Sequence, residues 1–108
     1  MAKILTIDTS NNKKISVGLD IDGRKSEVTK DSTFLKSEAA LPVVDKLLKK
    51  NNLSIEEVDK IRINKGPGSF TGLRVGVAIA NALAFLLKIS VNGKKVGELE
   101  EPVYNEYS

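Results

Sequence analysis

A glycine-rich stretch in the middle of the chain contains the residues whose types and spacing could do chemistry. Glycine adopts backbone angles that other residues avoid, and the free N–H groups at a helix start, capped here by Ser69 or Thr71, suit an anion. The stretch predicts either a phosphate cradle or a tight connection from strand to helix. We favour the connection, because the spacing is neither G-x-G-x-x-G nor the P-loop with its lysine. The residues concerned are Gly66, Pro67, Gly68, Ser69, Phe70, Thr71 and Arg74.

Two residue types that carry much of enzyme chemistry are missing from the sequence. The chain has no Cys, which removes disulfides, thiolate metal sites and Cys nucleophiles. It also has no His, the commonest metal ligand and the commonest general base near neutral pH. These two absences exclude zinc sites and His-dependent catalytic triads.

Length and charge indicate one small domain with an acidic tail. The 108 residues suit a single hydrophobic core, so we expect a lobe at 1–95 and a tail at 96–108, which contains four Glu and no basic residue. Residues 1–95 contain all 17 basic residues and 10 of the 14 acidic ones, a charge of +7. Such a basic body suits an approach to RNA phosphates, although lysines also simply keep a surface soluble. We expect neither a secretion signal nor a membrane span, which needs about 20 apolar residues. We expect a cytoplasmic protein.

The apolar pattern predicts an α/β fold with the order strand, strand, strand, helix, strand, helix, strand. A stripe at helical spacing indicates an amphipathic helix at 38–50, with Pro42 in its first turn. Asp22-Gly23 predicts a two-residue hairpin turn, and Asn92-Gly93 predicts another turn. The predicted strands are 3–8, 14–20, 24–30, 60–64 and 89–91, and the second helix ends near residue 87.

The second helix carries small residues at every fourth position. Gly72, Gly76, Ala80 and Ala84 form a ridge without bulky side chains, which lets another element approach closely. Packing against the protein's own sheet or first helix is the commoner explanation of such a face. The segment is apolar almost all round, however, and is interrupted only by Asn81. One face can then cover the sheet while another meets a partner.

The tail has no hydrophobic period. It is either a docked extended segment or disordered. We expect partial docking through its apolar residues, which are Val96, Leu99, Val103 and Tyr104.

Three segments resemble the bacterial TsaB (YeaZ) family of tRNA threonylcarbamoyladenosine biosynthesis proteins. The sequence GPGSFTGLRVG at 66–76 resembles the hallmark of that family. Residues 7–10 with the following Ser16 and Val17 resemble the family's opening, and KSEAALP at 36–42 resembles its His-Ser-Glu-x-x-Leu-Pro segment, with Lys36 in place of the His. The resemblance implies a single ribonuclease-H-like lobe of the actin and Hsp70 type, with a five-stranded mixed sheet and two main helices.

Family members usually continue into a second lobe, which this sequence lacks. Residues 101–104 resemble the Pro-x-Tyr segment near the end of full-length members, so we expect a naturally minimal form that keeps the tail, rather than an expression fragment. ATPases of this fold bind nucleotide between two lobes, next to a carboxylate at the position of Asp8. The resemblance therefore implies that Asp8, Thr9 and Ser10 are a vestigial phosphate loop, with Asp8 accepting hydrogen bonds from its own turn and from the 66–72 loop.

What the resemblance implies is a non-catalytic scaffold rather than an enzyme, with no catalytic residue, no metal site and no cofactor of its own. In this family the partner is a TsaD-type paralogue, which holds the metal and modifies adenosine 37 of tRNA. A TsaE-type ATPase joins the pair, and tRNA is a possible contact within the complex. The first two helices make the partner contact, and the same surface forms a homodimer when the partner is missing. The expected interface residues are Val44, Leu48, Leu73, Gly72, Gly76, Val77, Ala80 and Ala84.

Three other functions remain as alternatives. In the first alternative, the chain is a homodimeric regulator that works without the paralogue. In the second, it is a stand-alone nucleotide-binding module that uses the start of the second helix. A protease is disfavoured, because the sequence lacks metal ligands, a His base and a Cys nucleophile.

Overall fold

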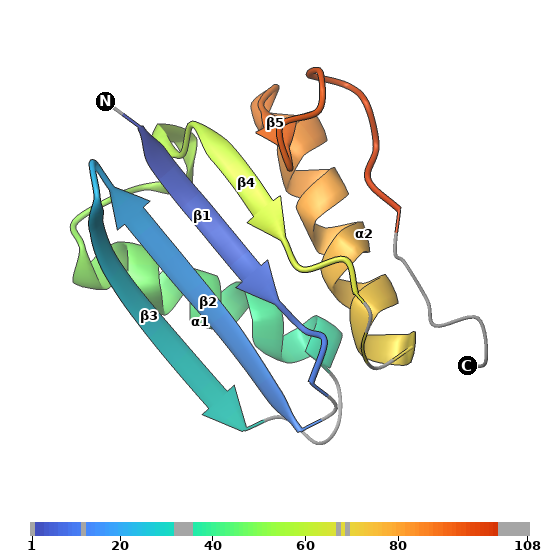
Figure 1. The fold of residues 1–108 in the computed structure, drawn as a ribbon. Coiled ribbons are helices and arrows are strands. Elements are labelled where there is room, and N and C mark those ends of the chain that lie inside the picture. The colour runs from blue at the N-terminus through green and yellow to red at the C-terminus, as the bar shows by residue number, and fades with distance from the viewer. Residues whose placement is uncertain (1, 12, 32–35, 67, 69, 102–108) are drawn as a thin grey trace.

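Five strands form one mixed sheet, and two helices pack together on one of its faces (Figure 1). The computed structural model describes residues 2–11, 13–31, 36–66, 68 and 70–101. The predicted α/β class and element order are confirmed, with one short 3-10 helix added. The elements are β1 (Lys3–Asp8), β2 (Lys14–Ile21), β3 (Arg24–Asp31), α1 (Lys36–Lys50), η1 (Ile55–Glu57), β4 (Lys60–Ile63), α2 (Phe70–Leu87) and β5 (Ser90–Val91).

The strand order across the sheet is β3-β2-β1-β4-β5. β1 pairs with β2 in antiparallel and with β4 in parallel orientation, so the central strand joins the N-terminal meander to the later half of the chain. In this register Leu5 lies opposite both Leu19 and Ile61. Such apolar rows run across the strands on the face that the helices cover.

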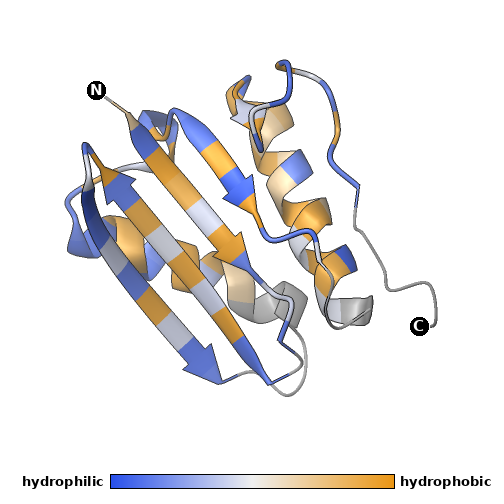
Figure 2. Ribbon diagram, viewed as in Figure 1, coloured by the Kyte–Doolittle hydropathy of each residue, from blue (hydrophilic) through white to orange (hydrophobic). Residues whose placement is uncertain are grey.

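The core lies between that face of the sheet and the two helices. Along β2, Ile15, Val17 and Leu19 are buried, and they alternate with more exposed residues on the other face, as the striped strands of Figure 2 illustrate. This alternation follows from the two-residue period of a strand. Among the described residues, no helix is long and apolar enough to cross a membrane.

The predicted hairpin turn between β2 and β3 is confirmed. Asp22 and Gly23 have φ angles of 53° and 91°, which is the left-handed region that two-residue hairpin turns require. The Gly23 N–H donates to the Asp20 carboxylate at 2.8 Å. Local residue chemistry therefore fixes the register of β2 against β3.

Pro42 lies inside α1, and its predicted place in the first turn is wrong. The helix begins at Lys36, two residues earlier than predicted, which moves Pro42 into the second turn. Proline lacks the N–H that would reach back to the carbonyl four residues earlier. Pro42 is exposed.

The short strand β5 is extended by a side chain instead of by more backbone. Asn92 has a φ of 52° and so leaves the strand. Its side-chain oxygen accepts from the Ile63 N–H at 2.8 Å, and its amide donates to the Ile63 carbonyl at 3.1 Å. The Asn92 side chain therefore replaces one further residue of strand pairing at the end of β4.

We predict that Asn92→Ala destabilises the fold more than Asn52→Ala does. Both asparagines have left-handed backbone angles, with φ values of 52° and 56°, so both substitutions lose the tolerance of Asn for that region. Only Asn92→Ala also leaves the Ile63 N–H and carbonyl without these partners. Urea unfolding should give an excess loss of about 1–3 kcal/mol for Asn92→Ala. Equal losses in the two variants would contradict the pairing role.

Candidate functional site

The loop after β1 and the loop between β4 and α2 meet at one end of the sheet. This juxtaposition brings Asp8 and Ser10 against Asn64 and the start of the glycine-rich stretch. A Cβ atom at Gly68 would lie 2.7 Å from the Ser10 Cβ and 2.8 Å from the Ser10 carbonyl oxygen. Glycine is therefore required at 68, because the two loops approach too closely for a side chain. Pro67 and Ser69 lie outside the described residues.

Asp8 accepts hydrogen bonds that hold these two loops together. One carboxylate oxygen accepts from the Ser10 N–H at 2.9 Å and from the Ser10 hydroxyl at 2.6 Å. The other accepts from the Asn64 amide at 3.3 Å, and the Asn64 oxygen accepts from the Gly66 N–H at 3.1 Å. These contacts give Asp8 a structural use at both of its oxygens. In the described ranges, no cluster of three or more Asp or Glu side chains could hold a metal ion.

Thr9 joins the end of β1 to the first turn of α2. Its buried hydroxyl donates to the Gly72 carbonyl oxygen at 2.6 Å. One turn further along the helix, a Cβ at Gly76 would overlap the Thr9 hydroxyl and would stand 3.0 Å from Ile63 Cδ1. Glycine is thus required at 76, because Thr9 occupies the space that a side chain at this position would need. Thr71, one of the two predicted caps, lies inside α2, which begins at Phe70, so it cannot be the residue before the helix.

The structure corrects the predicted partner interface. All eight of its residues are buried within the chain's own fold, so none of them presents surface to a partner. Within the ridge of small residues, Gly76 faces Thr9 and Ile63, which leave no room for a side chain at that position. The buried residues are Val44, Leu48, Gly72, Leu73, Gly76, Val77, Ala80 and Ala84.

The outer face of the helical layer carries apolar side chains that sequence periodicity did not single out. Phe85 and Leu86 at the end of α2 are 72% and 73% exposed, and Leu41 of α1 is 50% exposed. Ala78 and Ala82 are also exposed on α2, and Figure 2 shows apolar colouring along most of this helix. We call Leu41, Ala78, Ala82, Phe85 and Leu86 the outer apolar face. Phe85 and Leu86 are adjacent in the chain at the end of α2, and a contiguous exposed apolar patch is typical of an interaction site.

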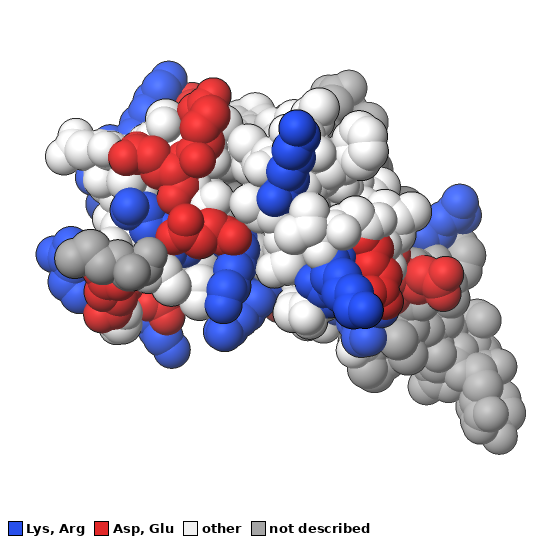
Figure 3. Space-filling model, turned by 90° about the horizontal axis from the view of Figure 1, so that it is seen from above, with Lys and Arg blue, Asp and Glu red and all other residues white. Residues whose placement is uncertain are grey.

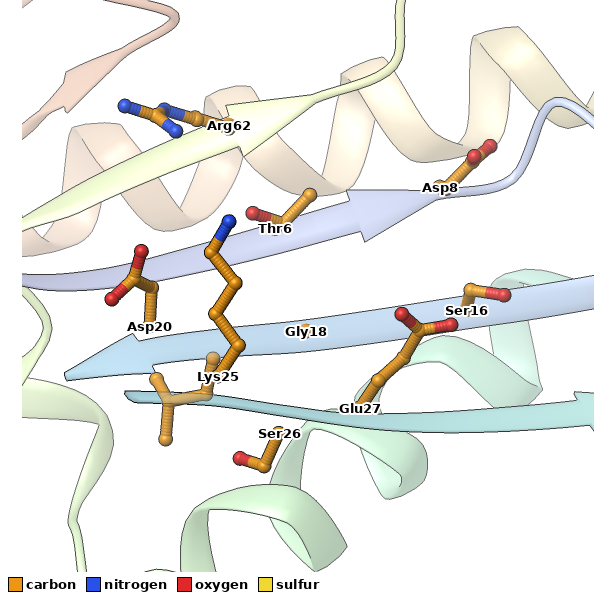
Figure 4. A pocket seen from close by; sticks show the side chains of 10 residues that line it. Thr6, Asp8, Ser16, Gly18, Asp20, Lys25, Ser26, Glu27 and Arg62 are labelled. Carbon is orange, nitrogen blue, oxygen red and sulfur yellow. The ribbon is translucent and has the colours of Figure 1, made fainter. Parts of the chain in front are cut away.

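A shallow hollow of about 500 Å³ lies on the sheet face opposite the helices. Its side chains come from β1 to β4 and include both charge signs, with Lys25 and Arg62 beside Asp20 and Glu27 (Figure 4). Gly18 lies in its floor. Polar residues alternate with the core residues along these strands, so this face is suited to contact with water.

Charges of both signs are mixed on the surface of the protein. Figure 3 shows Lys and Arg interleaved with Asp and Glu on the face it presents. In the described part of the chain, the exposed pair Lys49 and Asp45 lies 2.9 Å apart on α1. Such a mixed surface supports solubility and does not indicate a continuous phosphate-binding stripe on the face seen.

Residues 96–101, which we call the strap, run beside α2 and are anchored by Glu100 (Figure 1). The Glu100 N–H donates to the Asn81 side-chain oxygen, and the Asn81 amide donates to the Glu100 carbonyl, both at 2.9 Å. The predicted docking through apolar side chains is wrong for Val96 and Leu99, which are each 61% exposed. Val103 and Tyr104 lie outside the described residues.

The Glu100 carboxylate is buried but well supplied with partners. It accepts from the Asn92 amide at 2.8 Å and from the Glu101 N–H at 3.0 Å, and it lies 3.5 Å from Lys65 Nζ and 3.8 Å from Lys94 Nζ. Burial alone would raise the pKa of Glu100, but these hydrogen bonds and lysines outweigh it and hold the pKa below its ordinary value of 4.5. Sequence reasoning missed this site; its one signal was Asn81, the polar interruption of an apolar helix.

Comparison with known proteins gives a family match over more than half of the chain. The family model described as "TsaD: tRNA N6-adenosine threonylcarbamoyltransferase" matches residues 35–95. The "tRNA threonylcarbamoyladenosine biosynthesis protein TsaB" of Haemophilus influenzae is 38% identical over 76% of this chain and 34% of its own length. The protein of that name from Bacillus subtilis is 33% identical over 94% of this chain and 49% of its own length.

A solved structure shows the same architecture. "YeaZ from Pseudomonas aeruginosa" superposes with a TM-score of 0.80 and 33% sequence identity, over 88% of this chain and 44% of that chain. The chain thus spans between about a third and a half of the length of these relatives.

We predict that Thr9 and Gly76 are energetically coupled. Gly76→Ala should destabilise the fold by about 1–3 kcal/mol, because the new methyl group overlaps Thr9. In a Thr9→Ala background the hydroxyl is absent, so the same substitution should cost less, and a double-mutant cycle in urea should report coupling of about 0.5–3 kcal/mol. Gly18→Ala is the matched control, since its new Cβ would meet only ordinary contacts at 3.7 and 3.8 Å. Additive losses would argue against the contact.

We predict that Glu100 makes stability depend on acid pH. Since its folded pKa is lowered, its contribution is complete above the unfolded pKa and is lost as the pH falls through the folded value. The free energy of unfolding should therefore decrease as the pH is lowered from about 5 to below 4. Glu100→Gln should flatten this dependence and lower stability at pH 7 by about 1–3 kcal/mol, whereas Glu98→Gln should preserve it. A wild-type pH profile in the Glu100→Gln variant would refute this assignment.

Proposed function

We propose, from the premise that this chain belongs to the TsaD family and resembles its TsaB (YeaZ) members, that it is an accessory subunit of tRNA threonylcarbamoyladenosine biosynthesis. In this role it pairs with a TsaD-type paralogue, and the paralogue carries out the chemistry. A TsaE-type ATPase and tRNA then join the pair in the cytoplasm. The TsaB relatives are named for that biosynthesis, which supports the pathway.

The observation that carries the proposal is the outer apolar face. Water contacts Phe85 and Leu86 over most of their surface, at 72% and 73% exposure. Burial of apolar surface stabilises by about 25 cal/mol per Å², so covering two large side chains and Leu41 favours association. Because the face belongs to the same helical layer as the core, a partner with a similar layer can pack against it helix to helix.

The hydrogen bonds of the Asp8 carboxylate support a scaffold rather than an enzyme. The carboxylate that would assist a nucleotide is bonded to Ser10 and Asn64. These hydrogen bonds let the carboxylate hold two loops in place. They would have to break before the carboxylate could bind a ligand. The loop is therefore better suited to holding β1, β4 and α2 together.

In isolation the same face would join two copies of the chain. A two-fold axis through the helical layer would bury the same residues in both copies. The paralogue would then replace one copy. A homodimer that ignores the paralogue would instead favour the regulator without the partner.

We predict that Leu86→Glu and Leu41→Lys prevent pairing and leave the chain folded. Light scattering on the chain alone should give the mass of a dimer, and addition of the cognate TsaD-type protein should give a one-to-one complex. Each variant should remain monomeric and bind the paralogue at least about tenfold more weakly, because a buried charge without a partner is costly. Far-ultraviolet circular dichroism should be unchanged, since both positions are exposed.

The matched control is Val96→Glu, which places the same charge at an exposed apolar residue of the strap. It should pair as the wild type does. The proposal is wrong if the wild-type chain is monomeric and does not bind the paralogue. The interface alone is wrong if wild-type pairing survives in both face variants.

A further inference from the structure

The strap is held by polar contacts and not by burial of apolar groups. Its two described large apolar side chains, Val96 and Leu99, point into solvent, with 61% of each exposed. The buried part of the strap is Glu100, of which only 4% is exposed. Nearly all of its attachment therefore depends on one residue.

Glu100 connects three separate elements at a single point. Its backbone pairs with Asn81 of α2, while its carboxylate meets Asn92 after β5 and Lys65 before the glycine-rich loop. Lys94 lies next to it at 3.8 Å and also lies 3.6 Å from Glu98. The titratable groups around the carboxylate are thus Lys65 and Lys94, with Glu98 sharing the second lysine and Glu101 following in the chain.

The contacts of Asn81 and Asn92 are those of peptide groups. The Asn81 side chain both donates to and accepts from the backbone of Glu100. The Asn92 side chain does the same with the backbone of Ile63. The Asn92 amide then passes its second N–H to the Glu100 carboxylate. A continuous row of hydrogen bonds thus runs from β4 through Glu100 to α2.

We propose that the strap is a reversible latch: its attachment through Glu100, which we call the catch, breaks and re-forms without unfolding of the core. Segments that bury little apolar surface open at a lower free energy than the whole protein unfolds. Gly97 has a φ of 91°, which gives the strap a joint between β5 and the catch. Opening exposes Asn81 on α2 and releases Lys65, the residue directly before Gly66. The latch goes beyond the proposed function and does not depend on any partner.

Amide hydrogen exchange, followed by nuclear magnetic resonance on the full chain, tests the latch. In the wild type, the Glu100 and Glu101 amides should exchange faster than the amides of β1 and β2, because they exchange from the open strap. Glu100→Gln should accelerate residues 100 and 101 and the Asn81 side-chain amide by about tenfold or more. Glu98→Gln removes the same charge and the 3.6 Å ion pair to Lys94, and should change these rates little.

The β1 and β2 amides of each sample are the internal reference for any change in global stability. Rates for residues 100 and 101 that equal those of β1 and β2 in the wild type would overturn the latch, since the strap would then open only with the whole fold. Equal acceleration by Glu98→Gln and Glu100→Gln would overturn Glu100 as the catch.

Discussion

The contact between Thr9 and the first turns of α2 is the constraint on which the rest of the structure depends. Thr9 is the first residue after the central strand, and its hydroxyl donates to the Gly72 carbonyl at 2.6 Å in a buried position. A hydroxyl can enter there only because Gly76 has no side chain. The helix is thereby drawn onto β1 and β4, and the glycine-rich loop must close the short distance that remains. The close approach of Gly68 to Ser10 follows from the same geometry.

The two faces of α2 explain why small residues alone did not identify the binding surface. A row of Gly and Ala permits close approach of any neighbour, whether a partner's helix or the protein's own sheet. Here the neighbour is the sheet, because Thr9 and Ile63 fill the space beside Gly76. The large side chains Phe85 and Leu86 are the ones left to solvent. Their exposure depends on the angle at which α2 packs, which periodicity in one sequence does not contain.

Local chemistry made the fold predictable, and contacts distant in sequence made the site less so. Alternating Ile15, Val17 and Leu19 and the Asp22-Gly23 turn act over a few residues, and both predictions are confirmed. The resemblance to TsaB (YeaZ) proteins is confirmed by relatives of that name. In contrast, Glu100 and Asn81 are 19 residues apart. Asn81 stands out as a polar residue in an apolar helix, but the sequence does not indicate that two hydrogen bonds join it to Glu100.

The borders of the sheet restrict how this protein can assemble. β3 is an outer strand, and it carries Arg24, Lys25, Glu27, Lys30 and Asp31, all exposed. Charged side chains on a border strand oppose the addition of a strand from another molecule. At the opposite border β5 has only two residues, which is too short a template for a stable added strand. Growth of the sheet into fibrils or strand-exchanged dimers is therefore disfavoured at both borders, so a second molecule would have to contact the protein through a face and not through a sheet edge.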